Sequence, residues 1–224
     1  MRLLHAVLLL SAAITVSVAA APPDGSSART AAPAAIAADP QATPSGTIPL
    51  SVEKMQQYLL DAARAGETTL VADLLKAGAA IDAGNTSGHN ALILAAYNGH
   101  ADTVAALLKA GADPNVGDKR GNTALMGAIF KNEPGVIETL LAEPRTQVNA
   151  RNGAQQTAAM FAALFGKQEL LEKLAARGAD LTLADAAGQT AAQLAQHQGN
   201  AALALRIVEL GRIHARHAAA GGAR

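Results

Sequence analysis

Short apolar runs separated by polar turns recur along the chain with a spacing close to 33 residues. The sequence LLKAGA marks this spacing most directly, because it occurs at residues 74–79 and again at 107–112. The repeating units are 52–84, 85–117, 118–151, 152–184 and 185–211. Each unit has a polar opening, a short apolar run, a tight turn, a longer apolar run and a turn back. Repetition with this period predicts an array of small, similar structural units.

Residues at the ends of the apolar runs predict two helices in each unit. The short run is preceded by a side chain that accepts a backbone N–H, namely Asn90, Thr123, Thr157 or Thr190. It is followed by a residue suited to a left-handed helix end, namely Gly66, Gly99, Asn132, Gly166 or Gly199. The longer run ends at Gly78, Gly111 and Gly178, and Gly211 falls on the same column.

A two-helix unit cannot cover its own apolar stripe, so neighbouring units must stack to bury it. Alanine pairs at 62–63, 95–96 and 162–163 allow the close approach that stacking needs. The sequence therefore predicts an all-α solenoid of about five helix-turn-helix units, joined by β-turn or hairpin connections. At 143–146 the sequence EPRT replaces the Gly-Ala turn and adds a residue. Because Pro144 must end the helix there, we expect a local kink or bulge, and drift in an exposed turn explains it better than a functional insert.

These columns resemble the ankyrin repeat, whose pattern runs D-x-x-G-x-T-P-L-H-x-A-A-x-x-G-H, then a Leu-Leu helix, then G-A-D-x-N. One unit matches at Asp118, Gly121, Thr123, Leu125 and Ala128, and another at Gly99-His100 and Gly111-Ala112-Asp113 with Asn115. The resemblance covers residues 52–211. Alanine replaces the proline at 91, 124, 158 and 191, and the histidine of the Thr-Pro-Leu-His core is absent, which should soften the stack.

The resemblance implies a non-enzymatic protein-binding module, with no cofactor, whose concave face of turn tips and inner helices holds the partner. Carried onto this chain, the partner-facing positions are Arg64, Tyr97, Asn98, Lys119, Arg120, Phe130, Lys131, Arg151, Leu164, Phe165 and His197. Three of the five aromatic residues lie among them, whereas Phe161 is expected in the core. Exposed aromatics beside arginine are typical of binding hot spots.

The charges at these positions are all positive, while the acidic residues of the longer helices are expected on the opposite face. We therefore predict a basic, aromatic groove that docks an acidic or apolar patch of another protein. The alternative is that the aromatics fill gaps between repeats and the basic residues are ordinary solvated surface.

The N-terminal residues predict export. Residues 1–20 combine a basic Arg2, an apolar run and the small residues Val18-Ala19-Ala20, which is typical of a cleaved signal peptide. An uncleaved membrane anchor is the alternative, because the run from 3 to 21 is just long enough to span a bilayer. Residues 21–50 hold six of the nine prolines and are interpreted as a disordered Ala/Pro-rich tether. Residues 212–224 are expected to form a basic disordered tail.

Composition excludes several classes of protein. The formal net charge is zero, which favours neither nucleic acid nor a membrane surface as a partner, and a signal peptide also argues against nucleic acid. There is no cysteine, so disulfides, thiolate catalysis and cysteine-ligated metals are excluded. No phosphate loop, nucleophile elbow or paired-carboxylate motif is present.

These inferences predict a monomeric, periplasmic or secreted bacterial protein that binds another protein. One alternative is a metal-binding or enzymatic protein using His89, His197 or the His214–His217 pair, although the last is better explained as part of a solvated tail. Similarity to exported bacterial ankyrin proteins adds an accessory role for a periplasmic enzyme such as a catalase. A scaffold within an envelope assembly is a third possibility.

Overall fold

The computed structural model describes residues 51–221, and side chains are described as far as Ile213. The predicted signal peptide, the predicted tether and residues 222–224 lie outside this part. The described part contains ten α-helices and no strand, only an isolated antiparallel bridge between Ala184 and Thr190. None of these helices is both long enough and apolar enough to cross a membrane.

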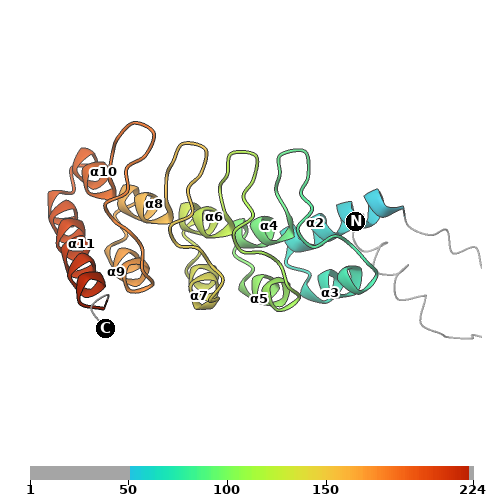
Figure 1. The fold of residues 1–224 in the computed structure, drawn as a ribbon. Helices are drawn as coiled ribbons and strands as arrows, with labels where there is room; N and C mark the ends of the chain where they lie inside the picture. The colour runs from blue at the N-terminus through green and yellow to red at the C-terminus, as the bar shows by residue number, and fades with distance from the viewer. Residues whose placement is uncertain (1–50, 222–224) are drawn as a thin grey trace, which may run out of the picture. The chain divides into compact units, whose positions relative to one another are not determined.

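The ten helices of the described part pair in chain order as five hairpins. The hairpins stack side by side (Figure 1). The short helices after the first hairpin are α4 (Ala91–Tyr97), α6 (Ala124–Lys131), α8 (Ala158–Leu164) and α10 (Ala191–His197). Their longer partners are α5 (Ala101–Lys109), α7 (Pro134–Ala142), α9 (Gln168–Ala176) and α11 (Ala201–Gly221). The first hairpin is α2 (Val52–Ala65) with α3 (Thr68–Lys76). The two kinds of helix make two layers, and this confirms the predicted all-α solenoid.

Leucine, isoleucine and alanine side chains between the layers form a continuous core. Leu59, Leu74, Leu107 and Leu140 are fully buried, and so are the alanines of the predicted close-contact pairs. Because alanine has no side chain beyond Cβ, the short helices of adjacent units approach closely. The core therefore runs along the row of units, and each unit completes the burial of its neighbours.

Several of the predicted helix ends are present. Asn90 Oδ1 accepts a hydrogen bond from the backbone N–H of Ile93 at 2.8 Å, and Thr123 Oγ1 accepts one from Met126 at 3.5 Å. At the other end of α6, Asn132 has a φ of 59°, the left-handed conformation that its place in the repeat predicts. Gly66 closes α2 with a φ of 78°.

Between the hairpins the chain extends into four long loops, which we call the fingers: 77–90, 110–123, 143–157 and 177–190 (Figure 1). Each finger folds on an opening Asn or Asp. In the second, Asp118 Oδ1 accepts from the backbone N–H groups of Arg120 at 2.8 Å and Asn122 at 2.9 Å. Neighbouring fingers are also joined, because the Lys119 N–H donates to the Ser87 carbonyl at 3.0 Å. The fingers therefore form a hydrogen-bonded row.

The irregular third finger is held by Arg145. Helix α7 ends at Ala142, and Glu143 is extended with a ψ of 116°. Arg145 pairs with Glu143 through Nε at 2.9 Å and donates from Nη2 to the Leu108 carbonyl at 3.1 Å. The side-chain hydrogen bonds that Arg145 donates to Glu143, followed by one from the Arg145 backbone N–H, lower the pKa of the Glu143 carboxyl. The extra residue is thus accommodated by a finger anchored to the preceding unit.

The C-terminal end differs from expectation. The sequence pattern predicts that Gly211 ends a helix and that residues 212–224 form a disordered tail, but α11 continues through Gly211 as far as Gly221. A single glycine within a helix costs only about 1 kcal/mol, and the alanine-rich sequence after it favours the helical state. The final helix has 21 residues, whereas α5, α7 and α9 have nine each.

Candidate binding groove

A groove of about 710 Å³ runs between the fingers and the short helices of the central units. Its apolar wall is built from α4, α6 and α8, with Ile93, Leu94, Met126 and Phe161 among the lining residues. The polar side comes from the fingers, which contribute His89, Asp118, Arg120, Asn122, Asn152 and Gln156. The fold brings these groups together because the fingers 77–90, 110–123 and 143–157 each lead into a short helix, α4, α6 and α8 respectively. We call this site the concave groove.

Three aromatic rings form a strip, and two of them, Tyr97 and Phe130, line the groove. The ring centroids of Tyr97 and Phe130 lie 6.3 Å apart with an interplanar angle of 14°, and those of Phe130 and Phe165 lie 5.8 Å apart at 74°. The residues remain 41%, 53% and 43% exposed in chain order. They belong to successive units, at the ends of α4, α6 and α8. Since large apolar side chains are rarely left in contact with water as a group, this strip is a candidate contact surface.

The side chain of Lys131 lies at the Tyr97 end of the aromatic strip. Lys131 Nζ lies 5.0 Å from the centroid of the Tyr97 ring, a cation–π distance. The charge of Lys131 therefore lies against the aromatic strip.

Acidic residues accompany the basic ones, so the expectation of an all-positive face is wrong. Arg64 Nη1 pairs with Asp61 Oδ1 at 2.8 Å. Asp118 itself lines the groove, with its Oδ2 atom 3.7 Å from His89 Nε2. Both carboxylates belong to the same helices and fingers as the predicted cations. The potential of this face is mixed, with Arg120 as the guanidinium that lines the groove.

The other predicted partner-facing residues are distributed along the same side of the stack. Arg151 Nε donates to the Gln155 carbonyl at 3.2 Å, which ties Arg151 to its own finger. Asn98 Nδ2 donates to the Leu94 carbonyl at 2.8 Å and caps α4.

The remaining predicted residues differ in exposure. Lys119 is exposed, Leu164 is half-buried, and His197 Nδ1 lies 3.3 Å from Gln189 Nε2 in the last unit. Of the predicted set, Tyr97, Arg120 and Phe130 line the groove.

Sequence reasoning missed part of the apolar wall. Phe161 was expected in the core, but it is half-buried and lines the groove. Ile93, Leu94 and Met126 were not predicted as site residues, although they line it too. Their only signal is their place in the first apolar run, and that place is shared by residues that face the core.

Metal binding has no support in the described side chains. In the range 51–213, no three His, Asp or Glu residues gather as a metal site would require. His89 and His197 have the single partners described above, and the side chains of His214 and His217 lie outside the described part.

The stacked hairpins, projecting fingers and concave groove define a helical repeat solenoid. Within it, residues 59–152 match the family model for ankyrin repeats (3 copies). The hairpins that follow this segment continue the same pattern, so the described unit is an ankyrin-repeat solenoid. Repeats of this family are generally protein–protein interaction modules and are typically non-enzymatic. The search of curated proteins found no match for the chain.

Proposed function

We propose that this protein binds a segment of another protein in the concave groove, and that the segment presents apolar side chains together with at least one carboxylate. The observation that carries the proposal is the strip of Tyr97, Phe130 and Phe165, three exposed rings of successive units that are joined through contacts of Phe130 with the other two.

The preference of the groove for apolar side chains rests on the burial of apolar surface when the segment binds. Covering an exposed aromatic side chain yields about 25 cal/mol for each Å² of apolar surface removed from water. Rigid aromatic rings lose little conformational entropy on binding, so most of this free energy is retained. The Met126 and Phe161 side chains extend the apolar surface from the strip into the groove.

The acidic part of the preference rests on Arg120 and Lys131. Arg120 lines the groove, and its planar guanidinium suits bidentate contact with a carboxylate. Lys131 lies over Tyr97 at the mouth. Asp118 accepts hydrogen bonds from the backbone of its own finger. Its carboxylate repels a carboxylate of the bound segment at this one place, and the repulsion helps to set the register of the segment.

Capture experiments test the proposal. The full chain is immobilised beside a Tyr97→Ala, Phe130→Ala, Phe165→Ala variant and exposed to envelope extract. A matched control carries Lys76→Ala and Lys109→Ala, which lie at the ends of the longer helices α3 and α5. We expect the partner to be lost from the aromatic variant and kept by the control. Equal recovery by all three proteins contradicts the groove as the binding surface.

The place of action is proposed from the N-terminal sequence. An exported protein is cleaved after Ala20, so N-terminal sequencing of protein from a periplasmic fraction should begin at Ala21. An intact Met1 in the membrane fraction indicates the anchor instead. In the envelope, an accessory role for an enzyme such as a catalase is one form of the proposed binding, and the captured partner identifies it.

A further inference from the structure

The last unit exposes the surface with which the other units stack. Val208 stands on the same column of the repeat as Leu75, Leu108, Leu141 and Ala175. The earlier members of this column are buried or half-buried, with Leu108 and Leu141 only 7% and 5% exposed, whereas Val208 is 42% exposed. The same holds for the helix-capping column, where Thr123 and Thr157 are buried and Thr190 is not. The C-terminal end of the row is therefore an uncovered repeat-stacking surface.

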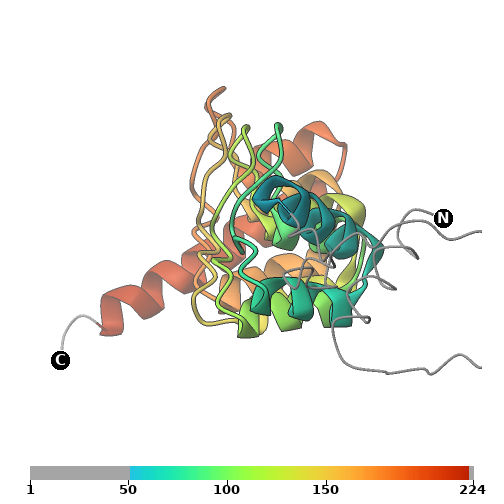
Figure 2. The same ribbon diagram turned by 90° about the vertical axis from the view of Figure 1, so that its right-hand side faces the viewer.

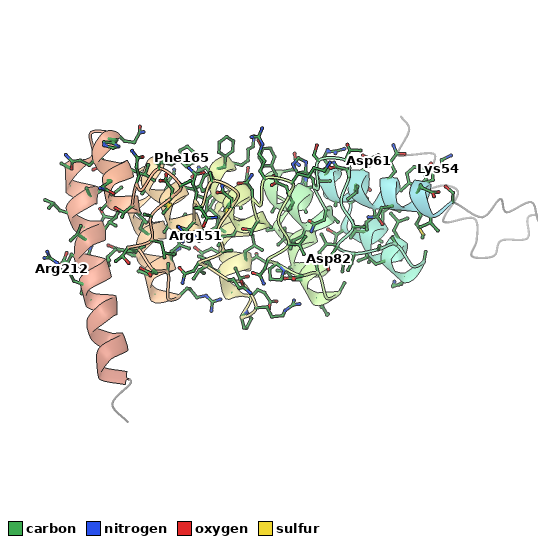
Figure 3. The ribbon with its side chains drawn as sticks, turned by 45° about the horizontal axis from the view of Figure 1, so that its top comes forward. Lys54, Asp61, Asp82, Arg151, Phe165 and Arg212 are labelled. Atoms are coloured by element: carbon green, nitrogen blue, oxygen red, sulfur yellow. The ribbon has the colours of Figure 1, made fainter. Side chains whose placement is uncertain are left out.

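This end is also hollowed. A depression of about 350 Å³ lies between the last finger and the two last helices, lined by Leu181, Thr190, Ala192, Ile207, Val208 and Arg212 among others. In Figure 1, α11 is the outermost helix, and no element of the described part follows it. Figure 3 shows Arg212 pointing away from the stack.

The outward face of α11 carries an apolar stripe with one acid and one base. Leu205, Val208 and Ile213 are 74%, 42% and 39% exposed. Glu209 and Arg212 are exposed as well, and together the five residues follow the i, i+3, i+4, i+7, i+8 spacing of one helix face. Terminal units of repeat proteins normally present a polar outer face to water. This stripe departs from that rule, so it needs a cover.

The length of α11 gives a second, independent reason. Beyond Gly211 the helix projects past the other long helices (Figure 2). A projecting helix of a few turns is marginally stable alone in water, and packing against another element is what usually stabilises it.

We propose that a second copy of this chain covers the stripe, by antiparallel pairing of the two α11 helices about a two-fold axis between Leu210 and Gly211. Such an axis places residue Glu209 of each copy opposite Arg212 of the other, and Val208 opposite Ile213. The stripe is thus complementary to itself, which is the requirement for an isologous dimer. The dimer replaces the monomer expected from the sequence, and the concave groove has no part in it.

Charge complementarity favours a copy over an unrelated partner. Glu209 accepts from Arg206 Nη1 at 2.8 Å, and Arg206 also binds Glu172 through Nη2 at 3.0 Å. Within the described part of the chain, no carboxylate pairs with Arg212. Across the two-fold axis Arg212 gains Glu209, and each Arg206–Glu209 pair is extended by a second cation.

Charge reversal tests the proposal with the full chain in sedimentation-equilibrium measurements. Glu209→Arg and Arg212→Glu each put like charges opposite one another at two places, so each should weaken dimerisation by at least about tenfold. The double variant Glu209→Arg, Arg212→Glu recreates both pairs with the charges exchanged and should regain most of the affinity. Leu205→Lys, at the most exposed apolar position of α11, should also dissociate the dimer. Phe130→Lys in the groove is the control and should leave the dimer unchanged.

The outcomes separate the possibilities. Circular dichroism establishes that each variant retains its helices, which is expected because all the changed residues are exposed. Weakening by both single reversals with recovery in the double variant supports the two-fold pairing. A folded chain that stays monomeric up to about 1 mM overturns it. Dimerisation that no α11 variant alters, or single reversals that the double variant fails to rescue, overturns it as well.

Discussion

The rings of Tyr97 and Phe130 lie 6.3 Å apart and within 14° of parallel, although they belong to different repeats. Because each ring restricts the rotamers of its neighbour, the rings of the strip are held in place before a partner binds. Preorganised aromatic side chains lose less entropy on binding than flexible ones. The strip is therefore suited to act as the anchor of the concave groove.

Replacing the central ring should weaken partner binding strongly and stability little. For Phe130→Ala we expect a loss of about 2 kcal/mol in binding free energy, about 30-fold in Kd, because Phe130 contacts both other rings. Its 53% exposure limits the cost in folding free energy to less than about 1 kcal/mol. Calorimetric titration with the captured partner and thermal denaturation measure the two effects. Phe130→Tyr is the control and should bind nearly as well; a large loss of stability in Phe130→Ala would instead assign the ring to the core.

Two glycines with a positive φ should differ sharply in their tolerance of alanine. Gly66 has a φ of 78°, and a Cβ there would lie 2.5 Å from His100 Nδ1, in a ring whose Nε2 atom is 2.9 Å from the Arg64 carbonyl oxygen. Gly78 has a φ of 98° and no atom within 4 Å of its Cβ position. We expect Gly78→Ala to cost about 1 kcal/mol from backbone strain alone. Gly66→Ala should cost about 2–4 kcal/mol because overpacking adds to the strain.

Urea denaturation of both variants measures the difference. The variant Gly66→Ala with His100→Ala should recover the overpacking part, since the imidazole no longer blocks the methyl group. Equal destabilisation of Gly66→Ala and Gly78→Ala contradicts the close approach between the first two units.

Asn132 should be replaceable by glycine but not by alanine. Its φ of 59° is left-handed, a conformation that asparagine tolerates, glycine adopts freely and alanine resists. Asn132→Gly is expected to leave the unfolding free energy unchanged or slightly raised, whereas Asn132→Ala should lower it by about 1 kcal/mol. Differential scanning calorimetry compares the two. If alanine proves as stable as glycine, the turn between α6 and α7 is not left-handed in solution.

The helices were predictable because each is set by local signals that recur. Asn132 shows this most clearly, since a short polar side chain in a glycine column is by itself enough to indicate a left-handed helix end. Gly211 shows the limit. Its column predicted a turn, but the intrinsic helix propensity of the alanine-rich residues after it decides instead, and α11 continues to Gly221.

The groove was predictable only in outline. Tyr97, Phe130 and Arg120 were found because the repeat pattern places them on the side of the fingers. Phe161 was assigned to the core because apolar periodicity does not distinguish a side chain buried between helices from one that lines a groove. The negative charge of Asp118 was overlooked because the part that Asp118 plays in folding its own finger already explains why an acidic residue stands there. Asp118 also lines the groove.

Removal of Arg145 should loosen the third finger in a pH-dependent way. The guanidinium joins Glu143 to the Leu108 carbonyl, so Arg145→Ala is expected to lower Tm and to increase amide exchange in the finger at 143–157. Hydrogen bonds from Arg145 lower the pKa of Glu143, so the stability gained from that carboxylate is present above the ordinary glutamate range. It is lost as the pH falls through the lowered value. The Tm difference between the chain and Arg145→Ala should therefore shrink on acidification.

Arg145→Lys is the control for charge alone and should recover only part of the difference, because lysine cannot donate to both sites in the same geometry. A Tm difference that is the same at neutral pH and below the pKa of Glu143 contradicts the role of the ion pair and leaves the bond to Leu108 as the anchor.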